Sequence, residues 1–356
     1  MTIRSFRGFC FPRTRLFAAA VVSISLVLGL AVAASVPGKA PAAVPATSGG
    51  FGFAGGSGFL WATDADLNRE LDAAARTDAT WLRVTLDWNA IEATKGAYNW
   101  SGPDRLINGA RARGLKVLAN VVSSPAWARP AGSFFTAPPT HNADLNTFLR
   151  RFIARYGNAV THHQIWNEPN LPIFFGGGID AVRYTSLLKS AYSTIKSAQP
   201  GATVISAGMS RSAGWNSPVN FHTAMYNAGA KGGFDALAMH PYVFPSGLHA
   251  NPENAISDVP AVRNLMVARG DGNKKIWFTE LGAPTGTAPE AVSEWEQAKE
   301  ITDVLGFASS AGYVGPTFIY SIRDNGPNAA DREQNFGSIY KHDWTPKYAA
   351  GVLGAT

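Results

Sequence analysis

From residue 51 to the C-terminus, two kinds of hydrophobic pattern alternate along the chain. Short apolar runs such as residues 81–86 are typical of buried strands, whereas residues 66–77 place Leu67, Leu71 and Ala74 on one face of a helix. The short runs predict eight strands, at residues 51–54, 81–86, 116–121, 163–168, 203–206, 236–240, 275–280 and 316–321. The helical spacing predicts helices at residues 66–77, 104–113, 143–156, 181–197, 218–228, 254–268 and 291–308, and a last helix that begins near Pro346.

Strict alternation of strands and helices predicts a parallel sheet, because each helix returns the chain to the edge where the next strand begins. Eight such units are the number that closes a sheet into a barrel. An open, doubly wound sheet is the alternative, but no glycine-rich dinucleotide-binding loop follows the first strand. We therefore predict an α/β fold, a (β/α)8 TIM barrel, as a single domain over residues 51–356.

The first 34 residues have the composition of a targeting segment. Four arginines precede an apolar run at residues 16–34, which contains the small-residue pattern Ala31-Val32-Ala33. Together these features indicate a secretory signal peptide, although the run is also long enough to span a bilayer as an uncleaved signal anchor. Either alternative places the rest of the chain outside the membrane. We therefore expect a secreted or cell-envelope protein, in which residues 35–50, rich in Pro, Ala and Gly, form a linker.

Composition and charge narrow the classes of function. With 46% hydrophobic and 16% charged residues, the chain has the composition of a globular protein. The net charge is +6, but the four N-terminal arginines account for most of it and leave 27 basic against 25 acidic residues. This balance gives no support to nucleic-acid binding. The only cysteine, Cys10, lies in the N-terminal segment, so the remainder has neither a disulfide nor a thiol nucleophile.

Two glutamates at the ends of predicted strands suggest the chemistry. Glu168 ends the fourth predicted strand and Glu280 ends the seventh. In an eightfold barrel, catalytic groups gather at the C-terminal ends of the strands. Two carboxyl groups in different surroundings can serve as acid and as nucleophile in the cleavage of a glycosidic bond.

Side-chain alternation predicts the surroundings of both carboxyl groups. Glu280 is expected to share a face with Ile276 and Phe278, at the mouth of an apolar stack that points into the barrel. Glu168 is expected to share a face with Trp166. Apolar surroundings raise the pKa of a carboxyl group and a cationic neighbour lowers it, so the two glutamates can be held in different protonation states.

The other strand ends are also polar or aromatic, as expected around a binding site. The residues concerned are Arg83, Asp87, Asn120, Asn167, His240, Tyr242 and Tyr320, and the loop at residues 123–127 adds two serines and Trp127. His162 and His163 are adjacent, so their side chains diverge, and the chain has no HExxH motif. We therefore predict no metal site and no cofactor. Without a His/Asp partnership for Ser123 or Ser124, a serine hydrolase is also disfavoured.

Four short motifs make the sequence similar to a known group of enzymes. Trp-Asn-Glu-Pro at residues 166–169 and Thr-Glu-Leu-Gly at residues 279–282 resemble motifs on the fourth and seventh strands of clan A of the glycoside hydrolases. His240-Pro241-Tyr242 and the Ser-Ser-Pro-Ala-Trp loop at residues 123–127 are most similar to glycoside hydrolase family 39 and to related bacterial exopolysaccharide hydrolases. The resemblance extends from about Phe51 to the C-terminus.

The resemblance implies a role for several of these residues. Glu168 would be the general acid/base and Glu280 the nucleophile of a hydrolysis that retains the anomeric configuration. Asn167 would contact the 2-hydroxyl group of the sugar, and Arg83 would keep Glu280 ionised.

The resemblance also implies that His240 and Tyr242 line the cleavage subsite. At the end of strand 8, many clan members have a tryptophan as the floor for the sugar, whereas this chain has Tyr320. The resemblance therefore does not extend to the sugar platform or to the substrate.

Structural alternatives remain for three of these residues. A structural ion pair is the alternative for Arg83, and a core histidine is the alternative for His240. Trp127 is as consistent with a packed loop anchor as with a sugar platform.

The sequence as a whole predicts an exported retaining glycoside hydrolase that acts on a polysaccharide or oligosaccharide. A transglycosylase that uses the same site is one alternative, and a non-catalytic carbohydrate-binding barrel of the cell envelope is another. The loops at residues 129–140 and 245–252 are expected to set the sugar, the linkage and the mode of attack.

Overall fold

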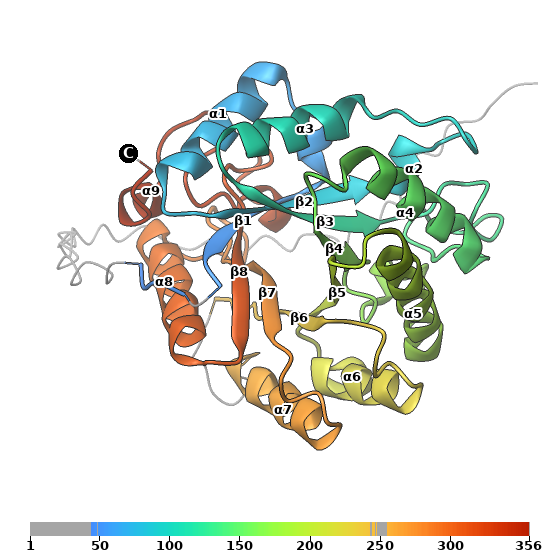
Figure 1. The fold of residues 1–356 in the computed structure, drawn as a ribbon. Coiled ribbons are helices and arrows are strands. Elements are labelled where there is room, and N and C mark those ends of the chain that lie inside the picture. Colours follow the sequence, from blue (N-terminus) through green and yellow to red (C-terminus); the bar gives the residue numbers. More distant parts are fainter. Residues whose placement is uncertain (1–43, 48, 243, 246, 248–254, 356) are drawn as a thin grey trace, which may run out of the picture. The chain divides into compact units, whose positions relative to one another are not determined.

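The structure, a computed structural model, describes residues 44–47, 49–242, 244, 245, 247 and 255–355, which lie in one compact unit that spans Pro41–Thr356. Eight parallel strands close into a barrel in which β8 pairs with β1 (Figure 1). The predicted (β/α)8 fold is confirmed. The predicted targeting segment and most of the loop at residues 245–252 lie outside the described residues. Within the described residues, no helix has the length and apolar character to cross a membrane.

The strands and helices alternate in the predicted order. The strands are β1 (Phe51–Gly55), β2 (Trp81–Asp87), β3 (Lys116–Val122), β4 (His162–Ile165), β5 (Thr203–Ser210), β6 (Ala236–His240), β7 (Ile276–Leu281) and β8 (Val314–Tyr320). The α-helices are α1 (Asp64–Arg76), α2 (Trp88–Ile91), α3 (Ser101–Ala112), α4 (Asn142–Tyr156), α5 (Ala181–Ala198), α6 (Pro218–Asn227), α7 (Ala255–Ala268), α8 (Glu294–Ser310) and α9 (Tyr348–Val352). Short 3₁₀ turns lie in four loops, at η1 (Ser57–Trp61), η2 (Pro172–Phe174), η3 (Gly214–Asn216) and η4 (Arg332–Gln334).

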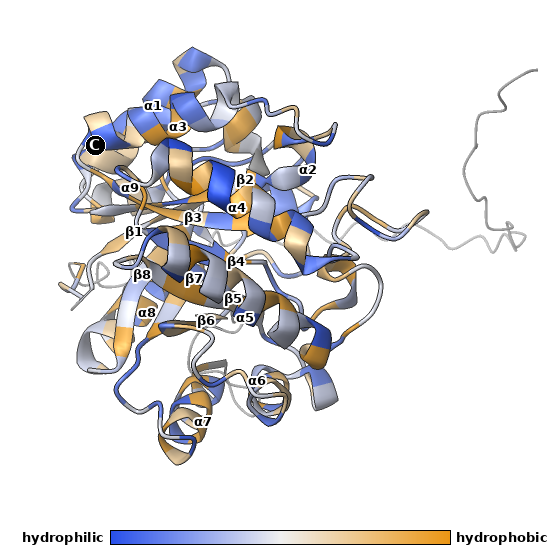
Figure 2. Ribbon diagram, turned by 45° about the vertical axis from the view of Figure 1, so that its right-hand side comes forward, coloured by the Kyte–Doolittle hydropathy of each residue, from blue (hydrophilic) through white to orange (hydrophobic). Residues whose placement is uncertain are grey.

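The helices form an outer ring around the sheet, and many of them carry both hydrophilic and hydrophobic positions (Figure 2). In α4, for example, Leu145, Phe148, Leu149 and Phe152 are buried while the residues between them are more exposed. This spacing of three and four residues is the one that predicted the helix. Burial of one helical face against the sheet therefore explains why the helices form where the periodicity places them.

A second apolar layer fills the inside of the barrel. It consists of Ala54, Trp81, Leu118, Ile205, Ala236, Ala238, Trp277 and Phe318. The rings of Trp81 and Trp277 lie 5.5 Å apart, and Trp277 stacks on Phe318 at 6.4 Å. These large side chains close the N-terminal part of the barrel interior, so polar residues can occupy only its other end.

The prediction that Ile276 and Phe278 point into the barrel is wrong. Phe278 points outwards and stacks on Phe307 of α8 at 6.2 Å, and Ile276 belongs to the same outer core. The inward residue is Trp277. Pairing between β7 and β8 becomes irregular after Phe278, which breaks the strict alternation on which the prediction rested. Glu280 reaches the mouth of the barrel although Phe278 does not face it.

Strand β4 ends at Ile165, three residues before the predicted end at Glu168. Trp166 and Glu168 have φ angles of 76° and 43°, in the left-handed region where a strand cannot continue. The backbone N–H of Glu168 instead donates to the carbonyl of Gly208 at 3.1 Å. The Glu168 side chain therefore comes from a tight turn that leaves the sheet, and it does not share a strand face with Trp166.

The described end of the predicted linker packs on the barrel. The indole N–H of Trp81 donates to the carbonyl of Gly49 at 3.0 Å, and Ser309 Oγ of α8 donates to the carbonyl of Ala46 at 2.8 Å. A Cβ atom on Gly49 would lie 2.4 Å from the nitrogen of Pro316. Glycine at this position therefore permits the chain to run close to β8.

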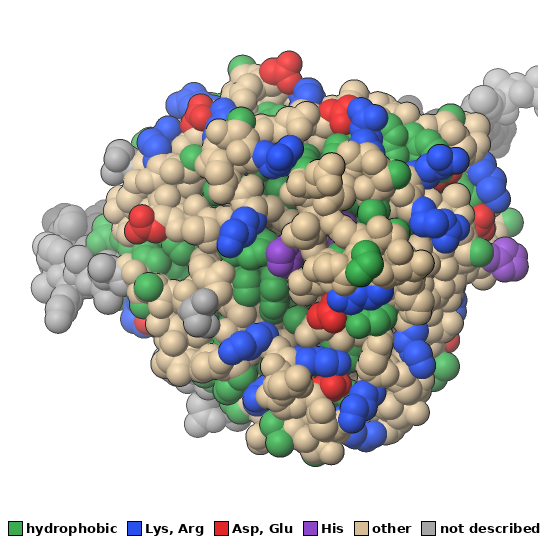
Figure 3. Space-filling view, viewed as in Figure 1, with side chains coloured by type: hydrophobic (Ala, Val, Ile, Leu, Met, Phe, Trp, Pro, Cys, Tyr) green, Lys and Arg blue, Asp and Glu red, His purple; other side chains and the backbone are tan. Residues whose placement is uncertain are grey.

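Charged side chains are scattered over the surface. In the face shown in Figure 3, Lys and Arg side chains are interspersed with Asp, Glu and uncharged residues, and those drawn in colour form no continuous basic band. Several of them are paired, for example Arg105 with Asp64 and Arg155 with Asp104. This distribution agrees with the near balance of charge outside the N-terminal segment.

A buried ion pair ties the loops after β7 and β8 to the start of α9. Lys347 Nζ donates to Asp324 Oδ1 at 2.7 Å and to Thr285 Oγ1 at 2.8 Å, and the side chains of Lys347 and Asp324 are 0% and 5% exposed. Burial lowers the pKa of Lys347 and raises that of Asp324. Each charge therefore depends on the other for its compensation inside the protein.

We expect Lys347→Ala to destabilise the fold by about 3–5 kcal/mol, because it leaves the Asp324 carboxylate buried without its partner. Lys341→Ala is the control, since Lys341 and Glu294 form a pair with side chains 47% and 33% exposed, and its effect should stay within about 1 kcal/mol. Urea unfolding at neutral pH measures both. Equal effects of the two substitutions would contradict the structural role of Lys347.

Candidate active site

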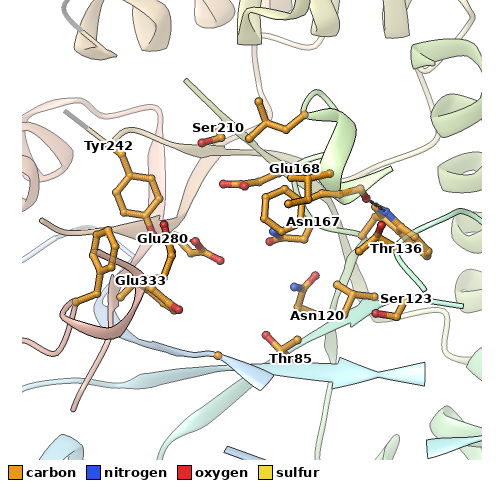
Figure 4. Close-up of a pocket in the computed structure, with 18 of the residues that line it drawn as sticks. Thr85, Asn120, Ser123, Thr136, Asn167, Glu168, Ser210, Tyr242, Glu280 and Glu333 are labelled. Atoms are coloured by element: carbon orange, nitrogen blue, oxygen red, sulfur yellow. Dashed lines mark hydrogen bonds between the residues drawn. The ribbon is translucent and has the colours of Figure 1, made fainter. Parts of the chain in front are cut away.

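A cleft of about 1530 Å³ opens at the C-terminal ends of the strands, and every one of the eight strand ends or following loops contributes to its lining. Of the predicted site residues, Asn167, Glu168, Tyr242, Glu280 and Tyr320 line it. Glu168 and Glu280 point into the same cavity, with Tyr242 beside Glu280 (Figure 4). The structure therefore brings together side chains that lie more than a hundred residues apart in sequence.

The two carboxyl groups lie close together across the cleft. One carboxylate oxygen of Glu168, one of Glu280 and a ring nitrogen of His240 lie within 4.8 Å of one another. Glu168 is 6% exposed, and the Glu280 side chain is 14% exposed. Both acids are thus largely shielded from bulk water while each keeps contact with the cleft.

Arg83 lies beneath the carboxyl pair and is 1% exposed. Its Nη1 donates to Glu280 Oε1 at 2.6 Å, its Nη2 to Asn167 Oδ1 at 2.8 Å, and its Nε to Gln164 Oε1 at 2.7 Å. When the Asn120 amide is oriented so that its oxygen faces the guanidinium, it accepts from Nη2 at 2.7 Å. Arg83 therefore fixes the ends of β3, β4 and β7 relative to β2, and it also neutralises Glu280.

The surroundings of Glu280 favour its ionised form. Burial raises the pKa of the Glu280 carboxyl, but the His240 ring and the Arg83 guanidinium outweigh burial and, with the Tyr242 hydroxyl, hold the pKa below its usual 4.5. Tyr242 donates to Glu280 Oε2 at 2.8 Å. Burial and the nearby Glu280 charge raise the pKa of Tyr242 well above 10, so its hydroxyl keeps the hydrogen that it donates.

A chain of hydrogen bonds runs from Arg83 to Glu168, and its direction follows from the donor groups. Arginine only donates, so Gln164 accepts through Oε1 and must donate through Nε2, which contacts Thr279 Oγ1 at 3.0 Å. Thr279 then has its own hydrogen for His240 Nε2 at 2.9 Å. A neutral His240 ring in this chain carries its hydrogen on Nδ1, which lies 2.7 Å from Glu168 Oε1.

This chain has a consequence for the Glu168 carboxyl group. Because His240 Nδ1–H donates to Oε1, a proton on the carboxyl group belongs on Oε2. Oε2 is then the atom that can exchange a proton with a molecule in the cleft. The alternative of a merely structural histidine is therefore not what the contacts of His240 indicate.

Asp87 is a cleft residue that the motif analysis noted only as a strand-end residue. It lies at the end of β2, and its Oδ1 is buried without a hydrogen-bond partner among the described residues. Burial raises the pKa of Asp87, against backbone N–H groups and the Ser123 hydroxyl, which lower it. Its position directly after an apolar strand, like that of the two glutamates, is the signal that could have identified it. Asp87 is therefore equipped to accept a hydrogen bond from a ligand hydroxyl group.

An aromatic cluster forms the wall beside Glu280. Phe336 lies within 6 Å, centroid to centroid, of the rings of Tyr242, Phe244 and Tyr320. Phe336 comes from the long loop after β8, where no local pattern distinguishes it from a packing residue. Tyr320 and Tyr242 thus provide ring surface in the position expected for a sugar platform.

Trp127 does not reach the cleft. Its indole N–H donates to the carbonyl of Glu92 at 2.9 Å, its ring packs edge-on against Trp88, and it does not line the cavity. This agrees with the alternative that Trp127 anchors its loop. The residues of this loop that do line the cleft are Ser123 and the segment 134–136.

Among the described residues, the trio of Glu168, His240 and Glu280 is the one group of acidic and histidine side chains close enough together to ligate a metal ion. Its atoms are already directed at protein partners. Glu280 binds Arg83 and Tyr242, and Glu168 binds His240. A cation at this position would have to compete with the guanidinium of Arg83 for Glu280. The arrangement is that of a hydrogen-bonded carboxyl pair.

No protein-family model matches the chain. Among solved structures, it is similar to a family 39 glycoside hydrolase from Bacteroides cellulosilyticus, with a TM-score of 0.68 and 24% identity over 85% of this chain and 63% of that one. A GH39 enzyme from Xanthomonas axonopodis gives a TM-score of 0.67 and 20% identity, covering 92% and 71% of the two chains. A monomeric beta-xylosidase from Caulobacter crescentus gives 0.67 and 19%, covering 88% and 69%. The fold is that of these structures, and the chain spans less than two thirds of the length of the first.

The direction of the hydrogen-bond chain predicts that neutral His240 is protonated on Nδ1. Long-range ¹H–¹⁵N spectra of the imidazole ring measure this directly. Thr279→Val removes the hydroxyl that faces Nε2, so the two tautomers should become mixed, whereas Thr279→Ser should preserve the wild-type spectrum. A wild-type ring protonated on Nε2 would show that the chain runs in the opposite direction.

Proposed function

We propose that this protein is a retaining O-glycoside hydrolase that acts on a polysaccharide or oligosaccharide. The observation that carries the proposal is the carboxyl pair at the ends of β4 and β7, with one acid hydrogen-bonded by His240 and the other held by Arg83 and Tyr242. The similarity in fold to a family 39 glycoside hydrolase and to a beta-xylosidase supports the reaction class. The roles proposed below need no cofactor.

Glu280 is proposed as the nucleophile and Glu168 as the general acid of the first step. The Glu280 carboxylate attacks the anomeric carbon while the bond from that carbon to the leaving oxygen breaks. Glu168 transfers its Oε2 proton to the leaving oxygen. The glycosyl group is then bound to Glu280 as an ester, and Glu168 is ionised.

The second step reverses the role of Glu168. Its carboxylate removes a proton from a water molecule, the water oxygen bonds to the anomeric carbon, and the bond to Glu280 breaks. Two displacements on opposite faces restore the original anomeric configuration. The donor from His240 Nδ1 faces Oε1 throughout, so Oε2 gives and receives the proton in both steps.

The separation of the acids supports retention of configuration. Retaining enzymes hold their carboxyl groups about 5–5.5 Å apart, whereas inverting enzymes leave about 6.5–9.5 Å for an intervening water. Carboxylate oxygens of Glu168 and Glu280 lie within 4.8 Å of each other. Glu280 is thus close enough to reach the anomeric carbon itself.

Amide and carboxylate groups around the pair are proposed to bind sugar hydroxyl groups. Arg83 occupies the Asn167 Oδ1 atom, which leaves the Asn167 Nδ2 hydrogens for an acceptor on the substrate. Asp87 offers its unpartnered Oδ1 to a hydroxyl donor. Tyr320 takes the place of the usual tryptophan platform at the end of β8. Because the targeting segment is the basis for localisation, the reaction is proposed to take place outside the cytoplasmic membrane.

Replacement of each glutamate should give a different result with an activated aryl glycoside. Glu280→Ala should abolish the covalent intermediate whatever the leaving group, because no other side chain occupies its position. Glu168→Ala should still form the intermediate, since an activated leaving group barely needs protonation, but it should lose about 10²–10⁴-fold in turnover because the base is absent. Azide needs no base, so it should restore turnover and yield a glycosyl azide with the substrate's configuration.

Glu333→Ala is the matched control, since Glu333 also lines the cleft but is largely exposed and paired with Arg332. Neither a large loss nor azide rescue is expected for it. Product configuration by NMR and intact mass of the trapped enzyme are the measurements. An inverted product from azide-rescued Glu280→Ala, with no rescue of Glu168→Ala, would exchange the proposed roles.

Tyr242→Phe should shift the acidic limb of the kcat/KM profile to higher pH. The nucleophile must be ionised, so activity falls as the pH drops through the lowered pKa of Glu280, below 4.5. Removal of the Tyr242 hydroxyl removes a contribution that lowers this pKa, so the pKa rises. Tyr320→Phe is the comparison, because its hydroxyl contacts Asn325 and not Glu280. A shift to lower pH in Tyr242→Phe would contradict the assignment of Glu280.

A further inference from the structure

Large apolar side chains that remain exposed gather at the rim of the cleft. Trp61, Phe134, Phe135 and Ile173 are 64%, 72%, 52% and 70% exposed, and all four line the cleft. Trp215, also exposed, follows shortly after the lining residue Ala213. Exposed apolar groups that cluster in this way mark a binding surface, whereas isolated ones do not.

The loop that carries Trp61 is fixed although the indole ring is exposed. Arg105 of α3 donates from Nη2 to the carbonyl of Leu60 at 3.2 Å and from Nη1 to the carbonyl of Ala62 at 3.1 Å, on either side of Trp61. The Leu60 side chain is buried. The backbone therefore presents Trp61 to the cleft in a defined position, so little conformational entropy is lost when a ligand contacts it.

The loop with Phe134 and Phe135 is fixed in the same way. The carbonyl of Phe134 accepts from the N–H of Ala137 at 2.9 Å, and that of Phe135 accepts from the N–H of Ser124 at 2.8 Å. The second bond ties the rings directly to the end of β3. Both exposed rings thus have anchored backbones.

Ile173 lies in η2, and this turn is attached to the floor of the cleft. The indole N–H of Trp166 donates to the carbonyl of Phe174 at 2.9 Å. Trp166 is two residues from Glu168. The exposed groups therefore follow β1, β3 and β4 around the mouth, and the distance between any of them and the carboxyl pair is set by the barrel.

The cleft is larger than a site for one sugar requires. Pockets that hold a single small ligand enclose roughly 300–1,000 Å³. The cleft here encloses about 1530 Å³, and its polar carboxyl pair lies on the floor between exposed apolar groups of the rim. Space and apolar surface thus extend beyond the reacting bond on the β1–β4 side.

We propose that Trp61, Phe134, Phe135 and Ile173 form outer subsites that hold a glycan chain across the cleft, so that the enzyme cleaves within chains. This inference rests on the proposed function and adds the mode of attack to it. A sugar ring has an apolar C–H face that packs on an aromatic ring and hydroxyl groups at its edge. Between the apolar groups, the lining residues Thr136, Ser210 and Ser212 supply partners for those hydroxyl groups.

A glycan fits this surface better than a protein does. A stable protein interface needs about 800 Å² of closely packed surface on each partner, with a continuous apolar centre. Here the apolar groups surround a deep hollow instead of forming one patch. A narrow chain of rings can enter the hollow and contact the groups one after another.

The test compares polymer binding by two variants of the full chain. Native gels that contain soluble arabinoxylan, glucomannan or mixed-linkage β-glucan should retard the wild-type protein with at least one polymer. In the double variant Trp61→Ala/Phe134→Ala, the dissociation constant from this retardation should rise at least about tenfold. Tyr348→Ala removes an exposed aromatic ring on α9, away from the cleft lining, and should bind like the wild type.

Kinetics and solution size complete the test. The ratio of kcat/KM on the retarding polymer to kcat/KM on an aryl glycoside should fall at least about tenfold in the double variant and stay constant in Tyr348→Ala. Polymer products of the wild type should be oligosaccharides of several lengths. Release of monosaccharide alone, absence of retardation by all three polymers, or unchanged binding in the double variant would overturn the inference.

Two further outcomes separate the inference from other readings of the same surface. If light scattering shows a dimer that the double variant dissociates, the rim is an interface between copies and the inference is overturned. Aryl glycoside hydrolysis without polymer binding would overturn the inference but leave the proposed function intact. Polymer binding that depends on Trp61 and Phe134 in a protein that hydrolyses none of these substrates would overturn the proposed function and retain the glycan-binding rim.

Discussion

The buried guanidinium of Arg83 is the constraint on which the rest of the site depends. A charge in the interior is tolerated only if it is paired and its donors are all used. Arg83 meets this condition with one carboxylate and three side-chain amides, taken from the ends of β3, β4 and β7. These strand ends must therefore be in register before the charge is compensated. The closed barrel supplies that register, and the large interior residues Trp81 and Trp277 confine the polar groups to one end.

Because Arg83 can only donate, it also sets the direction of the hydrogen bonds around it. Gln164, Thr279 and His240 each accept on one side and donate on the other, so the polarity reaches Glu168 unchanged. The same guanidinium acts on Glu280 by direct contact. One buried cation thus gives two chemically identical side chains different surroundings, with an ionised carboxylate at one and a defined proton-bearing oxygen at the other.

The sequence predicted the barrel and the position of both glutamates, because strand length, helical spacing and strand ends are local features. It did not predict which face of β7 points inwards. Residues 276, 277 and 278 are all large and apolar, so alternation alone cannot choose between the two faces, and Trp277 occupies the interior. The left-handed backbone of Trp166 was equally hidden, since a bulky residue with positive φ is unusual. The partners of Arg83 come from three distant segments, and no local pattern records that they meet.

Trp166 connects the chemistry at the floor to the surface at the rim. Its left-handed conformation turns the chain out of β4 and so places Glu168 over the barrel, while its indole N–H holds the carbonyl of Phe174 in the turn that carries Ile173. Its own carbonyl accepts from the Asn120 amide at 2.9 Å when that amide oxygen faces Arg83. The position of the rim at this side is therefore linked through one buried residue to the same guanidinium that orders the carboxyl pair. Loops can vary in their exposed side chains without disturbing the pair, provided that this link is kept, which explains how a single rigid floor can serve different rims.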